Sequence, residues 1–264
     1  MTPLTTAERI KKYLKEGKRF DGRKPEEFRE LVIEKNVSCK AEGSVKVRLG
    51  KTEVVVGVKM APSEPYPDSP TKGNLMVTAE MLPLSSPRYE SGPPKFEAIE
   101  WARVTDRGLR ESGFVDFDKL CIKEGEKVWT VFVDVYSIND DGNLMDAATI
   151  GAIAAMKIAR IPKYDLDTDT VVYDELTDEK LPLTDHVPVA ISVHKIGKAL
   201  LVDPTREEED VSETRVTIGS SNGTISSLQK SNSKHLEIDE IKKVFEIATK
   251  ASDEINKKID ESLK

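Results

Sequence analysis

The chain contains few cysteines and no long apolar run. Only Cys39 and Cys121 occur among its 264 residues, each in or beside a segment typical of a strand. Two cysteines in a chain of this length argue against a disulfide framework or a zinc site, and we expect buried thiols in a reducing compartment. The sequence has neither 18 consecutive apolar residues nor a basic segment followed by an apolar one at its start. These absences predict a cytoplasmic protein without a membrane association.

Signatures of common catalytic and metal sites are also missing. The three histidines, His186, His194 and His235, follow no metal-ligand spacing, so we expect surface or packing roles for them. The sequence contains no P-loop, nucleophile elbow or dinucleotide-binding fingerprint. It therefore predicts no metal and no other cofactor.

The chain is acidic overall. Its formal net charge is −7 at pH 7, so the surface as a whole would repel a polyanion. Contacts with a nucleic acid must then come from a local cluster of Lys and Arg, because individual patches contact the phosphates.

Periodicity and turn residues separate a short N-terminal helical extension, residues 1–16, from one larger domain, residues 17–264. In the extension, Thr5 and Glu8 fit a capping box at the start of the helix. Gly17 predicts its end.

The larger domain divides into approximate halves, residues 17–160 and 161–264. Each half has alternating strand segments followed by a helix, and residues 144–160 form an additional helix between them. The other long helices are expected at about residues 96–112 and 238–263. This order predicts an α+β fold with helices packed on twisted sheets.

The segment DDGNLMDAATIGAIAAMKIAR, residues 140–160, has the layout of an anion site. An apolar strand ends in an Asp-Asp-Gly turn and a long helix begins immediately, so free backbone N–H groups and the positive helix end would suit a phosphate. Where such a site would use a hydroxyl and a cation, the chain has Asn143, Leu144, Met145 and Asp146. The pattern indicates a phosphate site that has lost its positive charge.

Three arginines lie on the predicted helix FEAIEWARVTDRGLRES. Arg103, Arg107 and Arg110 have the spacing i, i+4, i+7, which places them in one stripe where guanidiniums can bind successive phosphates. Alternatively, the acidic residues Glu100, Asp106 and Glu111 of the same helix neutralise them through i, i+3 and i, i+4 pairs. Spacing alone favours neutralisation and does not decide between the two.

Several acidic residues follow a predicted strand in VDPTREEEDVSETRV. Two inward-facing carboxylates in this segment could bind a metal or transfer a proton. The acids of the segment are Asp203, Glu207, Glu208, Glu209, Asp210 and Glu213. Runs of acids at the end of a strand are more often solvated, so we expect a solvated loop.

Five stretches together resemble the RNase PH family of phosphorolytic 3′-exoribonucleases. They are RFDGR, GSVKVRLGKTEVVVGVKM, LSSPRYESGPP, ARVTDRGLRES and DGNLMDAATIGAIAA. The similarity extends from about residue 17 to the last helix, and PYPDSPTKGNL and DGNLMDAA are similar to the non-catalytic branch found in the archaeal exosome. The resemblance implies the RNase PH fold, with two pseudo-repeated βαβ-type halves and a central helix.

The resemblance also implies an assembly. In the family branch, the non-catalytic subunit alternates with a catalytic RNase PH-like subunit in a six-membered ring, single-stranded RNA passes through the central channel, and cap subunits bind one face. The arginine helix lies at the interface with the catalytic subunit. This placement implies RNA binding by Arg103 and Arg107, with Arg110 next.

The chain departs from the catalytic family members at two places. Those members hold the attacking phosphate with Gly-Ser/Thr-Arg, where this chain has Gly142, Asn143 and Leu144. They also carry two aspartates six residues apart, where this chain has Glu209 and Arg215. Loss of the cation and of one acid implies a subunit that is not an enzyme by itself, but binds RNA and structures the active site of its catalytic partner.

Two other interpretations stay open on the sequence. A self-sufficient phosphorolytic 3′-5′ exoribonuclease would use Glu209 or Asp210 with a displaced phosphate site. A purely structural ring member would keep the interface and bind no RNA.

Overall fold

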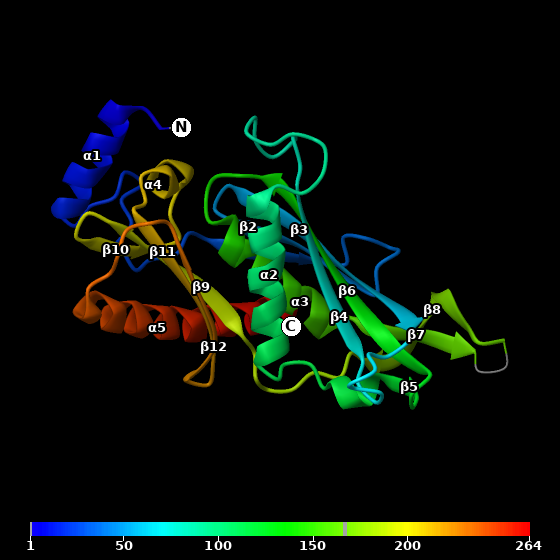
Figure 1. The fold of residues 1–264 in the computed structure, drawn as a ribbon. Coiled ribbons are helices and arrows are strands. Elements are labelled where there is room, and N and C mark those ends of the chain that lie inside the picture. The colour runs from blue at the N-terminus through cyan, green and yellow to red at the C-terminus, as the bar shows by residue number, and fades with distance from the viewer. Residues whose placement is uncertain (1, 166–167) are drawn as a thin grey trace.

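The computed structural model describes residues 2–165 and 168–264, so residue 1 of the predicted extension and residues 166–167 of the predicted second half lie outside it. Helices and strands form the α+β arrangement that the sequence predicts (Figure 1). Two main sheets and a separate two-stranded sheet carry the strands.

The first main sheet comes from the first half of the chain. Its strand order is β1-β2-β3-β6-β4, with β5 paired to β6. The pairs β1-β2, β2-β3 and β3-β6 are antiparallel, whereas β4 pairs parallel to β6 across the connection that contains helix α2. The elements are β1 (Leu31–Lys35), β2 (Gly43–Leu49), β3 (Thr52–Ser63), β4 (Asn74–Met81), α2 (Phe96–Glu111), the 3₁₀ helix η1 (Phe117–Leu120), β5 (Cys121–Lys123) and β6 (Lys127–Asn139).

The second main sheet comes from the second half and has the order β10-β9-β11-β12, with every pair antiparallel. Helix α5 packs on β9 and β11, and a separate hairpin, β7 with β8, extends away from the body (Figure 1). The elements are β7 (Arg160–Asp165), β8 (Thr170–Lys180), β9 (Val189–Ile196), β10 (Ala199–Val202), α4 (Arg206–Asp210), β11 (Thr214–Ser221), β12 (Thr224–Ser231) and α5 (Ile238–Leu263).

Helix α3 (Leu144–Ile158) is the predicted central helix. It packs on β2 and β3 of the first sheet and on β9 of the second, and its residues from Leu144 to Met156 are buried. Small residues allow this close approach: a Cβ atom added to Gly151 would lie 2.5 Å from Val56 Cγ2. The Ala- and Gly-rich composition of this helix therefore fixes its position between the sheets.

Helix α1 (Leu4–Lys15) docks on the outer edge of the second sheet. Ile10 and Leu14 form a small core with Ile196 and Leu201. Burial of this apolar stripe holds the N-terminal extension against the larger domain.

Two local predictions are wrong. The capping box at Thr5 does not form, because the helix begins one residue earlier and its N-cap, Pro3, has no side-chain hydrogen bond. Cys39 is exposed between β1 and β2 and Cys121 is half-buried at the start of the short strand β5, so neither is the buried thiol expected.

Candidate functional site

Arginines of the N-terminal segment of the larger domain converge on Asp203, which follows β10. The backbone N–H of Arg29 donates to Asp203 Oδ2 at 2.7 Å, and its guanidinium reaches both carboxylate oxygens at 2.9 and 2.7 Å. Arg23 Nη1 donates to Asp203 Oδ2 at 3.0 Å, and Arg19 pairs with Glu208. Asp203 has no exposed surface, so these bonds satisfy an otherwise uncompensated buried charge.

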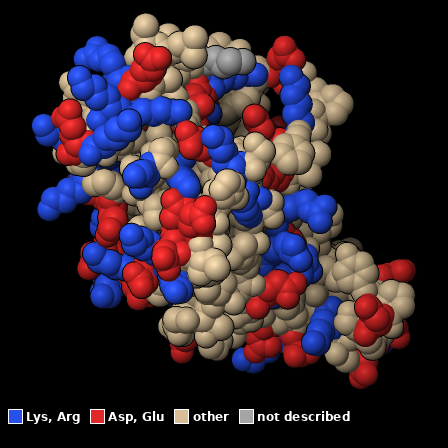
Figure 2. Space-filling view, turned by 60° about the vertical axis from the view of Figure 1, so that its left-hand side comes forward, with Lys and Arg blue, Asp and Glu red and all other residues tan. Residues whose placement is uncertain are grey.

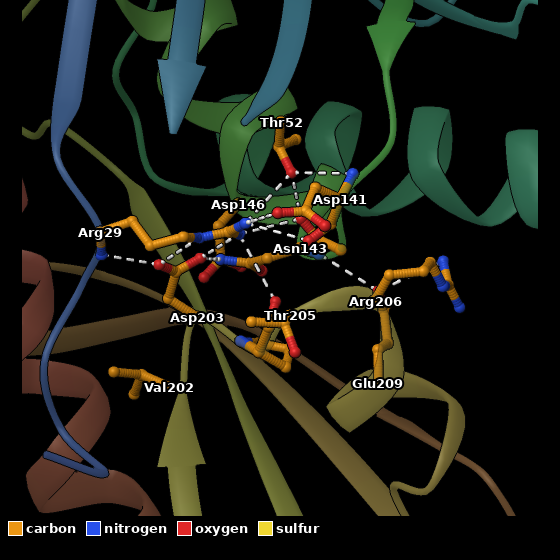
Figure 3. Close-up of polar contacts among 12 residues, drawn as sticks. Arg29, Thr52, Asp141, Asn143, Asp146, Val202, Asp203, Thr205, Arg206 and Glu209 are labelled. Atoms are coloured by element: carbon orange, nitrogen blue, oxygen red, sulfur yellow. Dashed lines mark hydrogen bonds and ion pairs between the residues drawn. The ribbon is translucent and has the colours of Figure 1, made fainter. Parts of the chain in front are cut away.

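The same arginine positions the turn before α3. Arg29 donates to the carbonyl oxygens of Asp141 at 2.9 Å and Gly142 at 3.0 Å, and Thr52 Oγ1 donates to the Gly142 carbonyl at 2.6 Å. Figure 3 shows Arg29 extending from the segment that precedes β1 into the space between this turn and Asp203. Arg29 thereby joins Asp203 of the second half to the turn before α3 in the first half.

The turn itself has an unusual backbone. Gly142 has a φ of +85°, and a Cβ atom added to it would lie 2.6 Å from the backbone nitrogen of Arg206. Asn143 has a φ of +59° and donates from its side chain to Asp203 Oδ1 at 2.9 Å. Asparagine tolerates this left-handed conformation better than most residues, whereas a β-branched residue would be strained there.

The acidic segment forms a helix and is not the solvated loop that we expected. Residues Arg206–Asp210 form the short helix α4, with a capping box between Thr205 and Glu208. Glu208 is buried against Arg19, and Asp203 is buried beneath the arginines described above. The prediction failed because distant arginines neutralise these acids, and local sequence does not show such partners.

Glu209 of α4 turns toward the start of α3. Its Oε2 accepts the backbone N–H of Asn143 at 3.1 Å and lies 3.4 Å from Arg206 Nη1. Burial raises the pKa of the Glu209 carboxyl, and the positive charge of Arg206 opposes that rise. The anion at this helix end is thus a side chain of the protein.

Arg215 of β11 forms contacts with a residue of the first half of the chain and with a neighbouring strand. Its Nη2 lies 2.7 Å from Glu100 Oε2 of α2 and donates to Ser231 Oγ at 2.9 Å. Glu209 and Arg215 both line a cavity of about 440 Å³, together with Arg206 and His194. Glu209 and Arg215 thus place an acid and a cation on this cavity at the two positions where we predict the family acids.

The three arginines of α2 differ in their surroundings. Arg103 and Arg107 are exposed and line a groove of about 570 Å³ between α2 and β12, beside Phe96 and Leu228. Neither has a hydrogen bond or ion pair with another residue in the described part of the chain. Arg110 instead donates to Asp106 at 2.7 Å and to the carbonyl of Leu75 at 2.8 Å.

Glu100 does not neutralise Arg103, the arginine that follows it by one helical turn. It precedes Arg103 by one helical turn and was the acid most able to neutralise it, but it pairs with Arg215. Sequence reasoning missed this ion pair because the partners lie in different halves of the chain. On the face shown in Figure 2, Lys and Arg are interspersed with Asp and Glu. This face therefore carries both signs of charge and no extended basic surface.

Two buried titratable groups lie close to the site. Asp146 has no exposed surface and accepts the backbone N–H of Ser192 with both oxygens, at 2.9 and 3.2 Å. Burial raises the pKa of Asp146 to about 7. His194 fulfils its expected packing role, and burial lowers the pKa of its imidazole well below the usual value, so it is neutral.

Residues 2–165 and 168–264 contain neither a metal-binding cluster nor a membrane-spanning helix. No group of three or more His, Cys, Asp or Glu side chains in these residues is placed to hold a metal ion. Their helices are too short or too polar to cross a membrane.

Models of the 3′ exoribonuclease family match most of the chain. Domain 1 of that family matches residues 27–162 and domain 2 matches residues 186–251. An "Exosome complex component Rrp42" of Methanocella arvoryzae is 46% identical over 248 residues, covering 93% of this chain and 92% of the relative. A protein of the same description from Thermococcus onnurineus is 46% identical over 258 residues, covering 95% and 92%.

Solved structures show the same relationship. A chain of the "archaeoglobus fulgidus exosome with RNA bound to the active site" superimposes with a TM-score of 0.89 at 42% identity, covering 96% of this chain and 97% of the other. A chain of an "Archaeal exosome core" gives a TM-score of 0.85 at 39% identity, covering 97% and 96%. By sequence over nearly its whole length, and by fold, this chain belongs to the 3′ exoribonuclease, or RNase PH, family.

Proposed function

We propose that this chain is a non-catalytic RNase PH-like subunit of an archaeal exosome in the cytoplasm, taking part in 3′-5′ RNA degradation. The observation that carries the proposal is the pairing of Glu100 with Arg215. It leaves Arg103 and Arg107 exposed on one groove while a cation fills a family acid position. The descriptions of the relatives, as components of an exosome, support the same conclusion.

The chain would not cleave RNA by itself. Leu144 is buried where catalytic members of the family have the arginine that binds phosphate, and Glu209 occupies the backbone N–H of Asn143. Arg215 replaces an acid, and a missing general acid or base typically lowers a rate about 10²–10⁴-fold. Both requirements of phosphorolysis, a phosphate site and a paired acid, would come from a catalytic RNase PH-like subunit.

RNA binding would be the direct contribution of this chain. Two exposed guanidiniums one helical turn apart can contact neighbouring phosphates of a single strand, and such contacts carry no sequence preference. Phe96 is 77% exposed at the edge of the same groove, and an aromatic ring there can stack on a base. The chain would thus hold the RNA strand against the active site of the catalytic subunit, while cap subunits contact another face of the ring.

The test is release of nucleoside diphosphates from a 3′-labelled single-stranded RNA in phosphate buffer with magnesium. It compares this chain alone, the catalytic subunit alone and an equimolar mixture. We expect no turnover by this chain and more activity in the mixture than in the catalytic subunit alone, because orientation of the substrate strongly affects rate. Turnover by this chain alone would overturn the proposal and support a self-sufficient exoribonuclease.

A further inference from the structure

Helix α1 carries a short row of cations on its solvent-facing side. Arg9, Lys12 and Lys15 are exposed and recur at i, i+3 and i+6, so neighbouring side chains of the row start about 5–6 Å apart. None of the three has an ion pair or a side-chain hydrogen bond within the described part of the chain. The opposite face of the helix packs on the second sheet through Ile10 and Leu14, which directs the row toward solvent.

An aromatic ring lies beside this row. Phe20 is 48% exposed, and the ring of Tyr13 meets its ring edge-on, with 5.1 Å between the two centroids. The guanidinium carbon of Arg9 lies 5.9 Å from the centroid of the Phe20 ring. The end of α1 therefore combines an exposed surface on which a base can stack with cations at its border.

The fold holds Phe20 in this place. Gly17 ends α1 with a φ of +70°, a conformation that favours glycine, and turns the chain back toward the helix. Next to Phe20, the buried Arg19 donates to the carboxylate of Glu208 at 2.9 Å and to the carbonyl of Asp203 at 2.8 Å. A ring that is positioned in advance by its neighbours loses little conformational entropy when a ligand stacks on it.

The charge of this segment favours a polyanion as its partner. Residues 1–20 contain six Lys or Arg side chains and two Glu side chains, although the whole chain has a net charge of −7. A single-stranded nucleic acid offers phosphates to the cations and unpaired bases to the ring. An acidic protein segment would also bind the cations, but it needs no aromatic face for stacking.

We propose that Arg9, Lys12, Lys15 and Phe20 form a second binding site for single-stranded RNA. The cations contact successive phosphates and the ring of Phe20 stacks on one base, so binding carries no sequence preference. Figure 1 shows α1 beyond β10, apart from α2 and its groove. This site goes beyond the RNA contact proposed for α2, shares no residue with it and needs no catalytic subunit.

The test measures RNA binding by the full-length chain without the catalytic subunit. Every protein in it carries Arg103→Ala with Arg107→Ala, which disables the arginine groove between α2 and β12. Fluorescence anisotropy of a labelled oligouridylate at several salt concentrations gives the slope of log K against log salt. The further substitutions Arg9→Ala, Lys12→Ala and Lys15→Ala should lower this slope by about 2, because each phosphate contact in a single strand contributes about 0.7.

The matched control removes the same charge from another helix. Lys243→Ala, Lys257→Ala and Lys258→Ala take three cations from exposed positions of α5. We expect this control to keep the slope of the parent protein, because the cations of α5 have no aromatic ring and no row that a single strand follows. Melting temperatures of both triple variants verify that the measured proteins are folded.

A substitution of Phe20 separates the ring from the charges. Phe20→Leu keeps an apolar side chain without an aromatic face, so the affinity for oligouridylate should fall about three- to tenfold with no change of slope. Tight binding of a labelled oligoglutamate that Phe20→Leu does not weaken would instead identify an acidic protein partner and would overturn the inference.

Two further outcomes contradict an RNA site on α1. One is an unchanged slope in the folded variant with Arg9→Ala, Lys12→Ala and Lys15→Ala. The other is the absence of oligouridylate binding by the folded parent protein at low salt. Neither outcome involves RNA turnover or the catalytic subunit, so a failure of this inference is distinguishable from a failure of the proposed function.

Discussion

Glu100 of α2 and Arg215 of β11 form an ion pair between the two halves of the domain, with 2.7 Å between Oε2 and Nη2. Glu100 lies one helical turn before Arg103, and Arg215 is the residue that we predict to replace a family acid. The acid closest to Arg103 on its N-terminal side is therefore engaged by a cation from the other half of the chain.

The first prediction concerns the arginine groove. In a ring assembled with the catalytic subunit, Arg103→Ala with Arg107→Ala should weaken binding of single-stranded RNA. Because each phosphate contact in a single strand contributes about 0.7 to the slope of log K against log salt, loss of two contacts should lower that slope by about 1.4. Arg160→Ala removes an exposed arginine of β7 and should leave the slope unchanged. An unaltered slope in the double variant would favour a purely structural ring member.

The second prediction concerns the pair between the halves. Glu100→Gln should destabilise the chain because it leaves the half-buried Arg215 guanidinium without its counter-charge, and a hydrogen bond to a charged group contributes about 1.5–3 kcal/mol. Urea unfolding of Glu100→Gln, Arg215→Met and the double variant gives the coupling energy of the pair. Glu97→Gln, at an exposed position one turn earlier, should change stability by less than about 0.5 kcal/mol. Additive effects of the two substitutions would contradict a coupled pair.

The third prediction follows from the buried carboxyl of Asp146. Its pKa rises from 3.8 to about 7 on burial, so the folded protein binds more protons than the unfolded chain between these pH values. The contribution of Asp146 to the free energy of unfolding therefore falls as pH rises through this window. Asp146→Asn should gain about 2–3 kcal/mol relative to the wild type between pH 5 and pH 8.

The measurement is urea unfolding of wild type and Asp146→Asn at both pH values. Asp253→Asn, an exposed position on α5, should show the same difference from the wild type at both. A constant difference for Asp146→Asn as well would mean that this carboxyl does not titrate between pH 5 and pH 8.

The fourth prediction concerns Arg29. Arg29→Ala removes the bidentate partner of the fully buried Asp203 and two hydrogen bonds to the turn before α3, and should cost about 3–5 kcal/mol of stability. Arg29→Lys keeps the charge but cannot make the paired contacts, and should recover only a fraction of the loss. Thermal unfolding, with the exposed Arg160→Ala as control, measures both. A loss below about 1 kcal/mol would show that Asp203 does not need this partner.

Local sequence patterns were sufficient to predict the long helices. The predicted helices at about residues 96–112 and 238–263 agree with α2 (Phe96–Glu111) and α5 (Ile238–Leu263), because their apolar residues recur at helical spacing. The central helix was also predictable, since its small residues follow a turn. The capping box at Thr5 failed, because the helix already begins at Leu4 and Thr5 lies within its first turn.

Charge partners could not be predicted in the same way. The solvated loop expected around Glu208 became a buried helix because Arg19, in a segment far earlier in the chain, pairs with that acid. The neutralisation expected on α2 holds for Arg110, whose acid lies four residues away, and fails for Arg103. Spacing along a helix identifies neighbours on that helix only.

The sequence by itself determined the family and the α+β arrangement, because these depend on residue identity and local periodicity. Tertiary structure alone decided the partners of the candidate site residues: Arg215 binds Glu100, and Glu209 accepts the backbone N–H of Asn143 at the helix end. The physical reason is that ion pairs and helix-end contacts act over a few ångströms in space, whatever the separation of their partners along the chain.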